Sequence, residues 1–222
     1  MPTSTVEDYL KCILLAQELD SEALVSMGQI SGALQVAPGT VTAMVKTLAD
    51  SGLVAYEPYS GVRLTPSGRQ LAAHVLRRHR LIELFLVKVM KMDWSEVHSE
   101  AEELEHAVSD RLIERMDEML GYPSVDPHGD PIPDVHGVVA APVLPSLLTC
   151  ALGVPLRVAR VADQGREFLQ LVEKRGLKPG SGVRVEHRDE AADTVDLRLE
   201  SGEPLSLGNR AASKIFVEPG SS

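Results

Sequence analysis

Histidine and carboxylate side chains gather in the middle of this 222-residue chain at spacings that suit metal binding. His98, Glu102, Glu105 and His106 follow one another at intervals of four, three and one residues. Intervals of three and four put side chains on one face of a helix, so the segment predicts a stripe of potential ligands. A solvated acidic helix face has the same pattern, so this alternative stays open.

Further potential ligands precede this stripe. His79 and Glu83 are four residues apart, and Asp8 could join from the first expected helix. Two antiparallel helices that both carry histidine and glutamate can converge on one ion, which strengthens the metal hypothesis. All these donors are carboxylate oxygens or imidazole nitrogens, which suit Mn²⁺ or Fe²⁺, although zinc, cobalt or nickel could also bind in vitro.

Cysteine usage and composition exclude several classes of protein. Cys12 and Cys150 are far apart and form no CxxC pair, which argues against a disulfide framework and a structural zinc knuckle. The sequence has no run of about 18 apolar residues and no basic, apolar leader at its start. We therefore expect a cytoplasmic protein without a membrane span.

The charge balance bears on nucleic-acid binding. The net charge is −10, and residues 1–70 hold four Lys or Arg against seven Asp or Glu. DNA-binding domains usually carry a basic surface, so this balance argues against DNA unless something neutralises the acids. Bound divalent cations would do so.

Residues 1–71 nevertheless have the pattern of a winged helix-turn-helix domain. Helices are expected over 5–20, 26–34 and 38–51, and short strands over 53–57 and 61–64. In such a domain the third helix enters the major groove. The residues expected to contact DNA are Ala37, Pro38, Gly39, Thr40, Thr42, Ala43 and Lys46.

The remainder predicts a helical domain followed by a small β domain. Helices are expected over 67–90 and from Asp93 towards Leu112, with Asp93 and Glu96 at capping-box spacing, and a separate shorter helix is expected to reach Leu120. About five short strands are expected, among them 156–161, 183–187, 194–199 and 215–217, with a helix over 166–175. The fold class is thus mainly α with a small β-barrel. The domains are 1–71, 72–140 (metal binding and dimerisation), a linker at 141–152, and 153–222.

Several stretches along nearly the whole chain resemble the diphtheria-toxin-repressor family of iron- and manganese-dependent regulators. They are Glu7-Asp8-Tyr9-Leu10, Val41-Thr42 through Leu53-Val54, Leu64-Thr65-Pro66-Ser67-Gly68, Arg78-His79-Arg80-Leu81 with Glu83, Val97-His98-Ser99-Glu100-Ala101 with Glu105-His106, and Pro127-His128-Gly129-Asp130-Pro131-Ile132-Pro133. The resemblance implies two metal sites per subunit and an SH3-like C-terminal domain.

The implied primary site contains Asp8, Glu102, Glu105 and His106. Iron-responsive members tend to have Met and Cys where Asp8 and Glu102 stand, whereas manganese-responsive members resemble this chain. Hard carboxylates in place of soft sulfur favour manganese over iron.

The implied ancillary site contains His79, Glu83 and His98, and a looser correspondence adds Gln164 and Glu167 from the C-terminal domain. Two-domain manganese regulators have Glu where Lys11 stands. A protonated lysine has no free lone pair, so we expect two separated ions rather than their close binuclear pair.

These features predict a repressor of metal-homeostasis genes that, loaded with metal, binds a palindromic operator in double-stranded DNA as a homodimer. The metal is expected to be Mn²⁺, with Fe²⁺ as the alternative. Two further hypotheses remain: a carboxylate-bridged di-metal enzyme, and a metal-independent dimeric repressor with a ligand in its C-terminal domain. Redox turnover with oxygen would favour the enzyme, and indifference to chelator would favour the metal-independent repressor.

Overall fold

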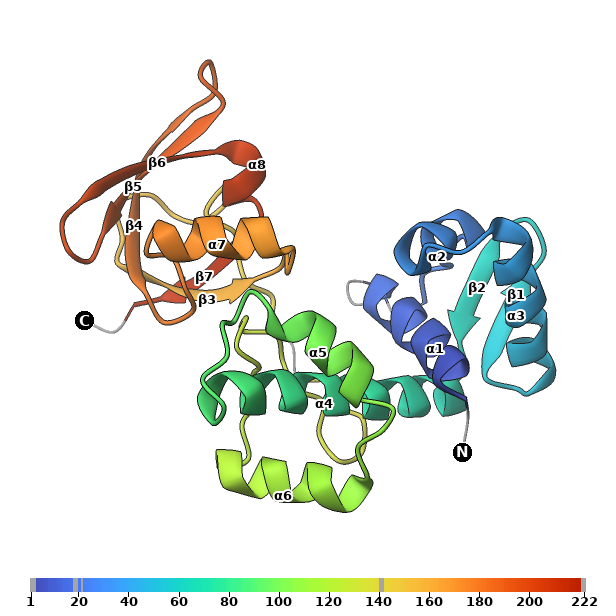
Figure 1. The fold of residues 1–222 in the computed structure, drawn as a ribbon. Helices are drawn as coiled ribbons and strands as arrows, with labels where there is room; N and C mark the ends of the chain where they lie inside the picture. The colour runs from blue at the N-terminus through green and yellow to red at the C-terminus, as the bar shows by residue number, and fades with distance from the viewer. Residues whose placement is uncertain (1–2, 18–19, 21, 140–141, 221–222) are drawn as a thin grey trace. The chain divides into compact units, whose positions relative to one another are not determined.

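The computed structural model describes residues 3–17, 20, 22–139 and 142–220. The chain forms two compact units, each described by itself: residues 1–79, 105–108 and 133–139 make the first, and the rest makes the second (Figure 1). Leu19 in the first expected helix and the domain boundary expected at residue 140 lie outside the described residues. No helix in the described ranges is long and apolar enough to cross a membrane.

The first unit contains the winged helix-turn-helix that the sequence predicts. Its elements are α1 Ser4–Ala16, α2 Met27–Leu34, α3 Pro38–Asp50, β1 Val54–Glu57, β2 Gly61–Leu64 and the first part of α4 Pro66–Lys88. The antiparallel hairpin β1–β2 runs from Val54 opposite Leu64 to Glu57 opposite Gly61. Their apolar residues form one core with those of α1–α3 and the start of α4.

Local signals fix the two helices of the helix-turn-helix. Ser26 and Gln29 form a reciprocal capping box at the start of α2. Pro38 occupies the first turn of α3, where its missing N–H breaks no helical hydrogen bond. Val41 and Val45 are fully buried on the inner face of α3. The outer face of α3 is thereby left to solvent.

The second unit holds the remaining helices and a five-stranded antiparallel sheet. Its elements are the end of α4, α5 Val97–Leu104, α6 Asp110–Leu120, β3 Leu156–Val161, α7 Arg166–Lys174, β4 Gly182–Asp189, β5 Thr194–Leu199, β6 Pro204–Gly208, α8 Asn209–Ala212 and β7 Ile215–Pro219. The strand order is β6-β5-β4-β3-β7. The sequence predicts about five strands, but it does not locate β6.

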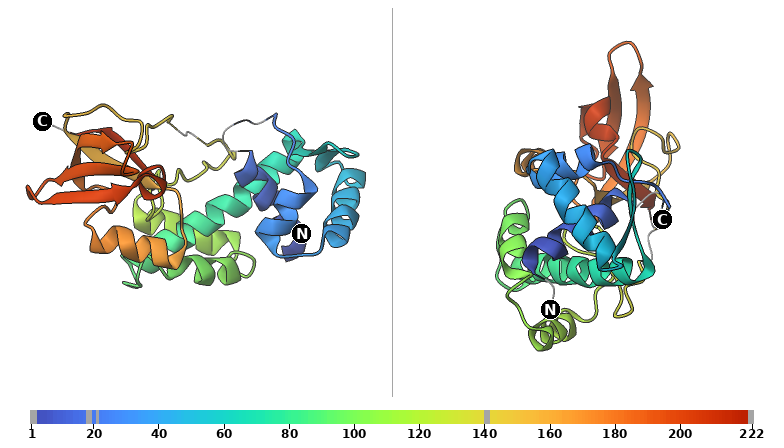
Figure 2. Two further views of the ribbon diagram at one scale, coloured as in Figure 1. Left: turned by 90° about the horizontal axis from the view of Figure 1, so that it is seen from above. Right: turned by 90° about the vertical axis from the view of Figure 1, so that its right-hand side faces the viewer.

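One core joins the sheet to residues outside it. Helix α7 covers one face of the sheet, and Leu169 and Val172 are buried there (Figures 1 and 2). Trp94, which precedes α5, belongs to the same core, and Lys178 lies 4.9 Å from its ring centroid. The segment before α5 is therefore packed against the β domain.

The expected linker 141–152 also contributes to this unit. Leu147 N–H donates to Ile215 O at 2.9 Å, and Val217 N–H donates to Pro145 O at 2.9 Å. These bonds lay the segment along the outer edge of β7. Leu147 and Cys150 are buried in the core of the β domain.

The prediction of one long helix from Asp93 towards Leu112 is wrong. Helix α5 begins only at Val97 and ends at Leu104, and a turn follows before α6. Asp93 does not cap a helix, because its carboxylate accepts the backbone N–H and the hydroxyl of Ser95 at 2.8 and 2.6 Å. Such local side-chain bonds compete with helix formation.

Candidate metal centres

The first candidate centre is in the first unit. Asp8, Glu105 and His106 each offer one ligand atom, and these atoms lie within 4.8 Å of one another. His106 Nε2 lies 2.9 Å from Asp8 Oδ1 and 3.2 Å from Glu105 Oε1. Two carboxylate oxygens and an imidazole nitrogen around one point form a donor set for a divalent cation.

Two local structures position these three residues. Helix α1 starts at an N-cap, Thr3, whose side chain accepts the N–H of Val6. Asp8 follows one turn later. Glu105 and His106 lie in the turn directly after α5, so they do not continue the helical stripe expected from their spacing.

Glu105 is fully buried and both its oxygens have partners. Lys11 Nζ donates to Oε1 at 2.6 Å, and His79 Nδ1 lies 2.6 Å from Oε2. Burial alone would raise the pKa of Glu105, but the hydrogen bond from His79 and the charge of Lys11 lower it below its ordinary value. Glu105 is therefore held as a carboxylate.

His106 has a carboxylate at each ring nitrogen. Nδ1 lies 2.7 Å from Glu7 Oε2, and Nε2 faces Asp8. Burial lowers the pKa of His106, but its hydrogen bond to Glu7 and the charges of Glu105 and Asp8 raise it overall. Lysine and histidine thus offset the acidic charge without any ion present, so the carboxylates do not simply repel one another.

The second candidate centre is in the second unit and is fully buried. Glu83, Asp126 and His128 offer ligand atoms within 4.8 Å of one another. Glu83 Oε2 lies 3.9 Å from His128 Nδ1. Burial and the charges of Asp130 and Glu83 raise the pKa of Asp126 well above its ordinary value. A cation here would offset that excess of negative charge.

A tight loop holds Asp126 and His128 in this centre. Asp126 Oδ1 accepts the backbone N–H groups of His128 and Asp130 at 2.8 and 2.9 Å. Gly129 has φ +87°, and a Cβ there would lie 1.9 Å from Ala159 O. Only glycine allows the loop to approach β3 so closely.

The expected ancillary residues His79, Glu83 and His98 offer ligand atoms that lie within 4.8 Å of one another. His98 Nδ1 lies 3.1 Å from Glu83 Oε1, and His98 Nε2 lies 3.7 Å from Glu102 Oε1. His79 is one helical turn before Glu83, but its Nδ1 faces Glu105. Glu102 is exposed and belongs to the second unit.

The two ligands expected from the β domain have other surroundings. Gln164 Nε2 donates to Asp130 Oδ2 at 2.8 Å, and Glu167 is exposed in the first turn of α7. Asp130 Oδ1 also lies 2.5 Å from Arg160 Nε. Gln164 thus contacts the loop of the second centre through Asp130.

Sequence reasoning missed Glu7, Asp126 and His128. Glu7 directly precedes Asp8, but its partner His106 is 99 residues away in the sequence. Asp126 and His128 lie in a proline-rich loop, where helical periodicity gives no indication of ligands. The string Asp-Pro-His-Gly-Asp, with two acidic residues and a histidine close together, could have indicated potential metal ligands.

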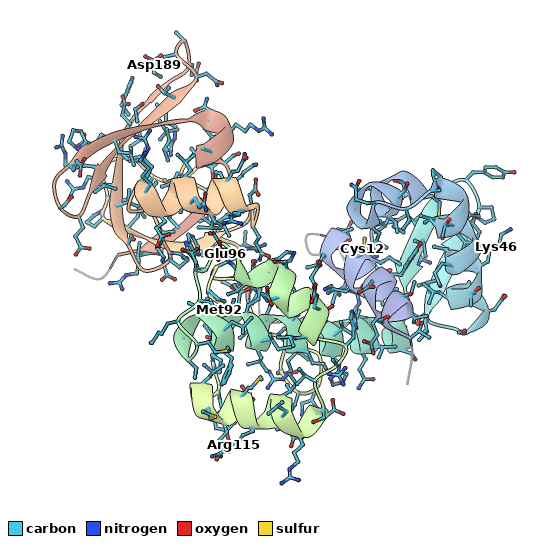
Figure 3. All side chains as sticks on the ribbon, viewed as in Figure 1. Cys12, Lys46, Met92, Glu96, Arg115 and Asp189 are labelled. Carbon is cyan, nitrogen blue, oxygen red and sulfur yellow. The ribbon has the colours of Figure 1, made fainter. Side chains whose placement is uncertain are left out.

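The residues expected to contact DNA are on the outer side of the first unit. Ala37, Pro38, Gly39, Thr40, Ala43 and Lys46 are exposed, and Thr42 is half-buried. Lys46 points away from the rest of the N-terminal domain (Figure 3). The hydroxyl of Thr42 donates to Pro38 O at 3.0 Å, within the helix.

Comparison with known proteins covers all of these regions. Residues 1–62 match the family model "Iron dependent repressor, N-terminal DNA binding domain". Residues 65–134 match "Iron dependent repressor, metal binding and dimerisation domain", and residues 146–219 match "FeoA domain".

Individual relatives match over most of the chain. A solved structure described as "Manganese-dependent transcriptional repressor complex with manganese" is 41% identical, with a TM-score of 0.88 over 96% of this chain and 99% of that one. The iron-dependent repressor IdeR of Mycobacterium leprae (strain TN) is 29% identical over 96% of both chains. The diphtheria toxin repressor of Corynebacterium efficiens is 37% identical over 60% of this chain and 57% of its own length.

These findings settle the class of protein. The chain combines a DNA-binding domain, a helical metal-binding and dimerisation domain and an SH3-like FeoA domain. It is a metal-dependent transcriptional regulator that binds DNA as a homodimer, and the enzyme hypothesis does not account for its N-terminal domain. The chain belongs to the diphtheria-toxin-repressor family of iron- and manganese-dependent transcriptional regulators.

Proposed function

We propose that this protein is a manganese-responsive repressor of metal-homeostasis genes. The observation that carries the proposal is the cluster of Asp8, Glu105 and His106, whose donors are all oxygen or imidazole nitrogen. Such hard donors suit Mn²⁺ and give no soft sulfur ligand that would favour other metals. Fe²⁺ is the alternative, because it accepts the same donors.

The cluster suggests how metal could act on DNA binding. Asp8 belongs to α1 of the DNA-binding domain, whereas Glu105 and His106 follow α5 of the dimerisation domain. A bound divalent cation would supply the positive charge that ties these side chains together. Ligation by all three would restrain α1, and reciprocal coupling then makes metal and DNA strengthen each other's binding.

We place a second metal site at Glu83, Asp126 and His128. All three side chains are buried, and burial with the charges of Asp130 and Glu83 raises the pKa of Asp126 although Arg80 Nε lies 3.8 Å from its Oδ2. His98, beside the other oxygen of Glu83, is available to the same ion. Two sites per subunit are therefore proposed. His79 remains a proposed ligand because its ligand atom is grouped with those of Glu83 and His98. Glu102, Gln164 and Glu167 remain proposed ligands through the family resemblance.

Asparagine at position 126 is expected to remove the second site while the first is retained. Asp126→Asn keeps the shape and the oxygen that accepts the loop amides, but removes the negative charge. Manganese bound per chain, measured by calorimetry and elemental analysis, should fall from two ions to one. Asp134→Asn is the matched control, because Asp134 is exposed and accepts the amides of His136 and Val138 in the same way. Two ions in both variants would exclude Asp126 as a ligand.

We also propose that the exposed side of α3, from Pro38 to Lys46, contacts base edges and phosphates. The homodimer would bind an inverted repeat whose half-sites are separated by about one helical turn or a multiple of it.

We also propose that the chain divides into domains at residues 1–71, 72–140 and 153–222. Buried Leu147 and Cys150 support adding the end of the 141–152 linker to the last domain. We also propose that the protein acts in the cytoplasm.

Selection of random-sequence DNA duplexes tests the whole proposal. Purified protein is incubated in parallel with Mn²⁺, with Fe²⁺ under anaerobic conditions, and with chelator. Enrichment of an inverted repeat with Mn²⁺ but not with chelator is expected. Enrichment in all arms would contradict the metal switch, and enrichment with Fe²⁺ alone would contradict the choice of manganese.

A further inference from the structure

We propose that Glu7 is a positioning residue that orients His106 and directs its Nε2 atom to the metal. This inference rests on the proposed first centre and deepens it. It assigns a function to a buried carboxylate that is not part of the ligand cluster itself.

Glu7 and the ligand atoms lie at opposite sides of the imidazole ring. Glu7 Oε2 is 2.7 Å from Nδ1 of His106, whereas Asp8 Oδ1 and Glu105 Oε1 are 2.9 and 3.2 Å from Nε2. The cluster of ligand atoms within 4.8 Å of one another contains Asp8, Glu105 and His106 but not Glu7. Glu7 therefore contacts His106 at Nδ1, the ring nitrogen that does not face the other proposed ligands.

The chemistry of imidazole makes this contact decisive. A neutral imidazole has one N–H and one lone pair, and an ionised carboxylate can only accept a hydrogen bond. An ion held by Asp8 and Glu105 would take the lone pair of Nε2, so the hydrogen would then be on Nδ1, which faces Glu7. Carboxylates that bind the second nitrogen of a metal-ligating histidine fix its tautomer and its orientation in this way.

The surroundings of Glu7 suit a rigid support. Its side chain is only 9% exposed, whereas that of Asp8 is 41% exposed. The backbone N–H of Glu7 donates to Thr3 O at 3.1 Å in the first turn of α1, so the helix fixes where its carboxylate begins. Asp8 is free to adjust to an ion, and Glu7 is held in place.

The test starts with the unmodified protein and needs no variant. In protein labelled with ¹⁵N and loaded with ¹¹³Cd²⁺, Nε2 of His106 should show one-bond coupling to cadmium, and Nδ1 should keep its proton. Coupling at Nδ1 would overturn the inference. Absence of any coupling to His106 would instead contradict the first centre, and the inference with it.

Variants then measure how much the support contributes. Glu7→Ala and Glu7→Gln should weaken Mn²⁺ binding about 10- to 100-fold, as loss of such outer partners generally does. The exposed Glu22→Gln, with the same charge change, should leave it unaltered. Glu7→Asp should restore part of the affinity if the carboxylate itself matters. Affinities of all four variants equal to that of the unmodified protein would overturn the inference, while thermal melting confirms that each is folded.

Discussion

Replacing His106 with alanine is expected to abolish the effect of manganese on DNA binding. The imidazole bridges α1 to the turn after α5, because its two nitrogens face Glu7 and Asp8. Without it, the proposed first centre loses a ligand, and Glu7 and Asp8 lose their contacts with the imidazole ring. Binding coupled through such a centre typically changes affinity about 5- to 150-fold, and this factor should fall to one.

The measurement is fluorescence anisotropy on the selected operator, with Mn²⁺ and with chelator, at one ionic strength. Constant salt matters because phosphate contacts make affinity for DNA strongly dependent on it. His136→Ala is the control, since His136 is exposed in a loop. A variant at position 106 that still responds to manganese as the unmodified protein does would exclude the first centre as the switch.

Replacing Lys11 with methionine is expected to destabilise the metal-free protein by about 3–5 kcal/mol, the usual effect of removing one partner of a buried ion pair. The side chains of Lys11 and Glu105 are 9% and 0% exposed, and their charged atoms are 2.6 Å apart. Methionine fills a similar volume but removes the ammonium group from Oε1 of Glu105, which then keeps only its contact with His106 Nε2 at 3.2 Å. The free energy of unfolding, obtained from urea titrations with chelator present, measures the loss.

The same pair predicts a dependence on pH. The folded state lowers the pKa of Glu105, so its contribution to stability is present above the unfolded pKa and is lost as pH falls through the folded pKa. The difference between Lys11→Met and the unmodified protein should therefore shrink in acid. Lys174→Met, at an exposed position, should change little at any pH. An equal effect at both positions would show that Lys11 does not stabilise Glu105.

Double substitution separates the ion pair from simple loss of packing. If Lys11 acts through Glu105, Lys11→Met combined with Glu105→Gln should be less destabilising than the sum of the single changes. Strict additivity would mean that the two side chains do not stabilise each other.

The sequence predicted elements that depend on local signals. Helix α3 was expected over 38–51 and is found at Pro38–Asp50, because a proline in its first turn and buried Val41, Val45 and Leu48 all favour the same boundaries. The hairpin strands were likewise expected within one residue of where they lie. In these segments the residue types and their near neighbours in the sequence determine where the helix and the strands begin and end.

The candidate centres depend on contacts between distant segments, and here prediction was incomplete. His98 and Glu105 were expected on one helix, but α5 ends at Leu104 and the two residues are used in different units. Periodicity gives no account of such a break. Lys11 was expected not to ligate, but its bond to Glu105 joins residues 94 positions apart, which spacing alone does not reveal.

The edges of the C-terminal sheet have a bearing on how the protein behaves when concentrated. An open β edge can pair with another chain and begin aggregation. Along β7 that edge is taken by residues 145–147 through the bonds of Pro145 and Leu147, and β6, at the opposite edge, is short and begins at Pro204. Residues 145–147 therefore cover a sheet edge that could otherwise pair with another chain. Changes in this segment should be judged by their effect on aggregation as well as by their effect on the connection between domains.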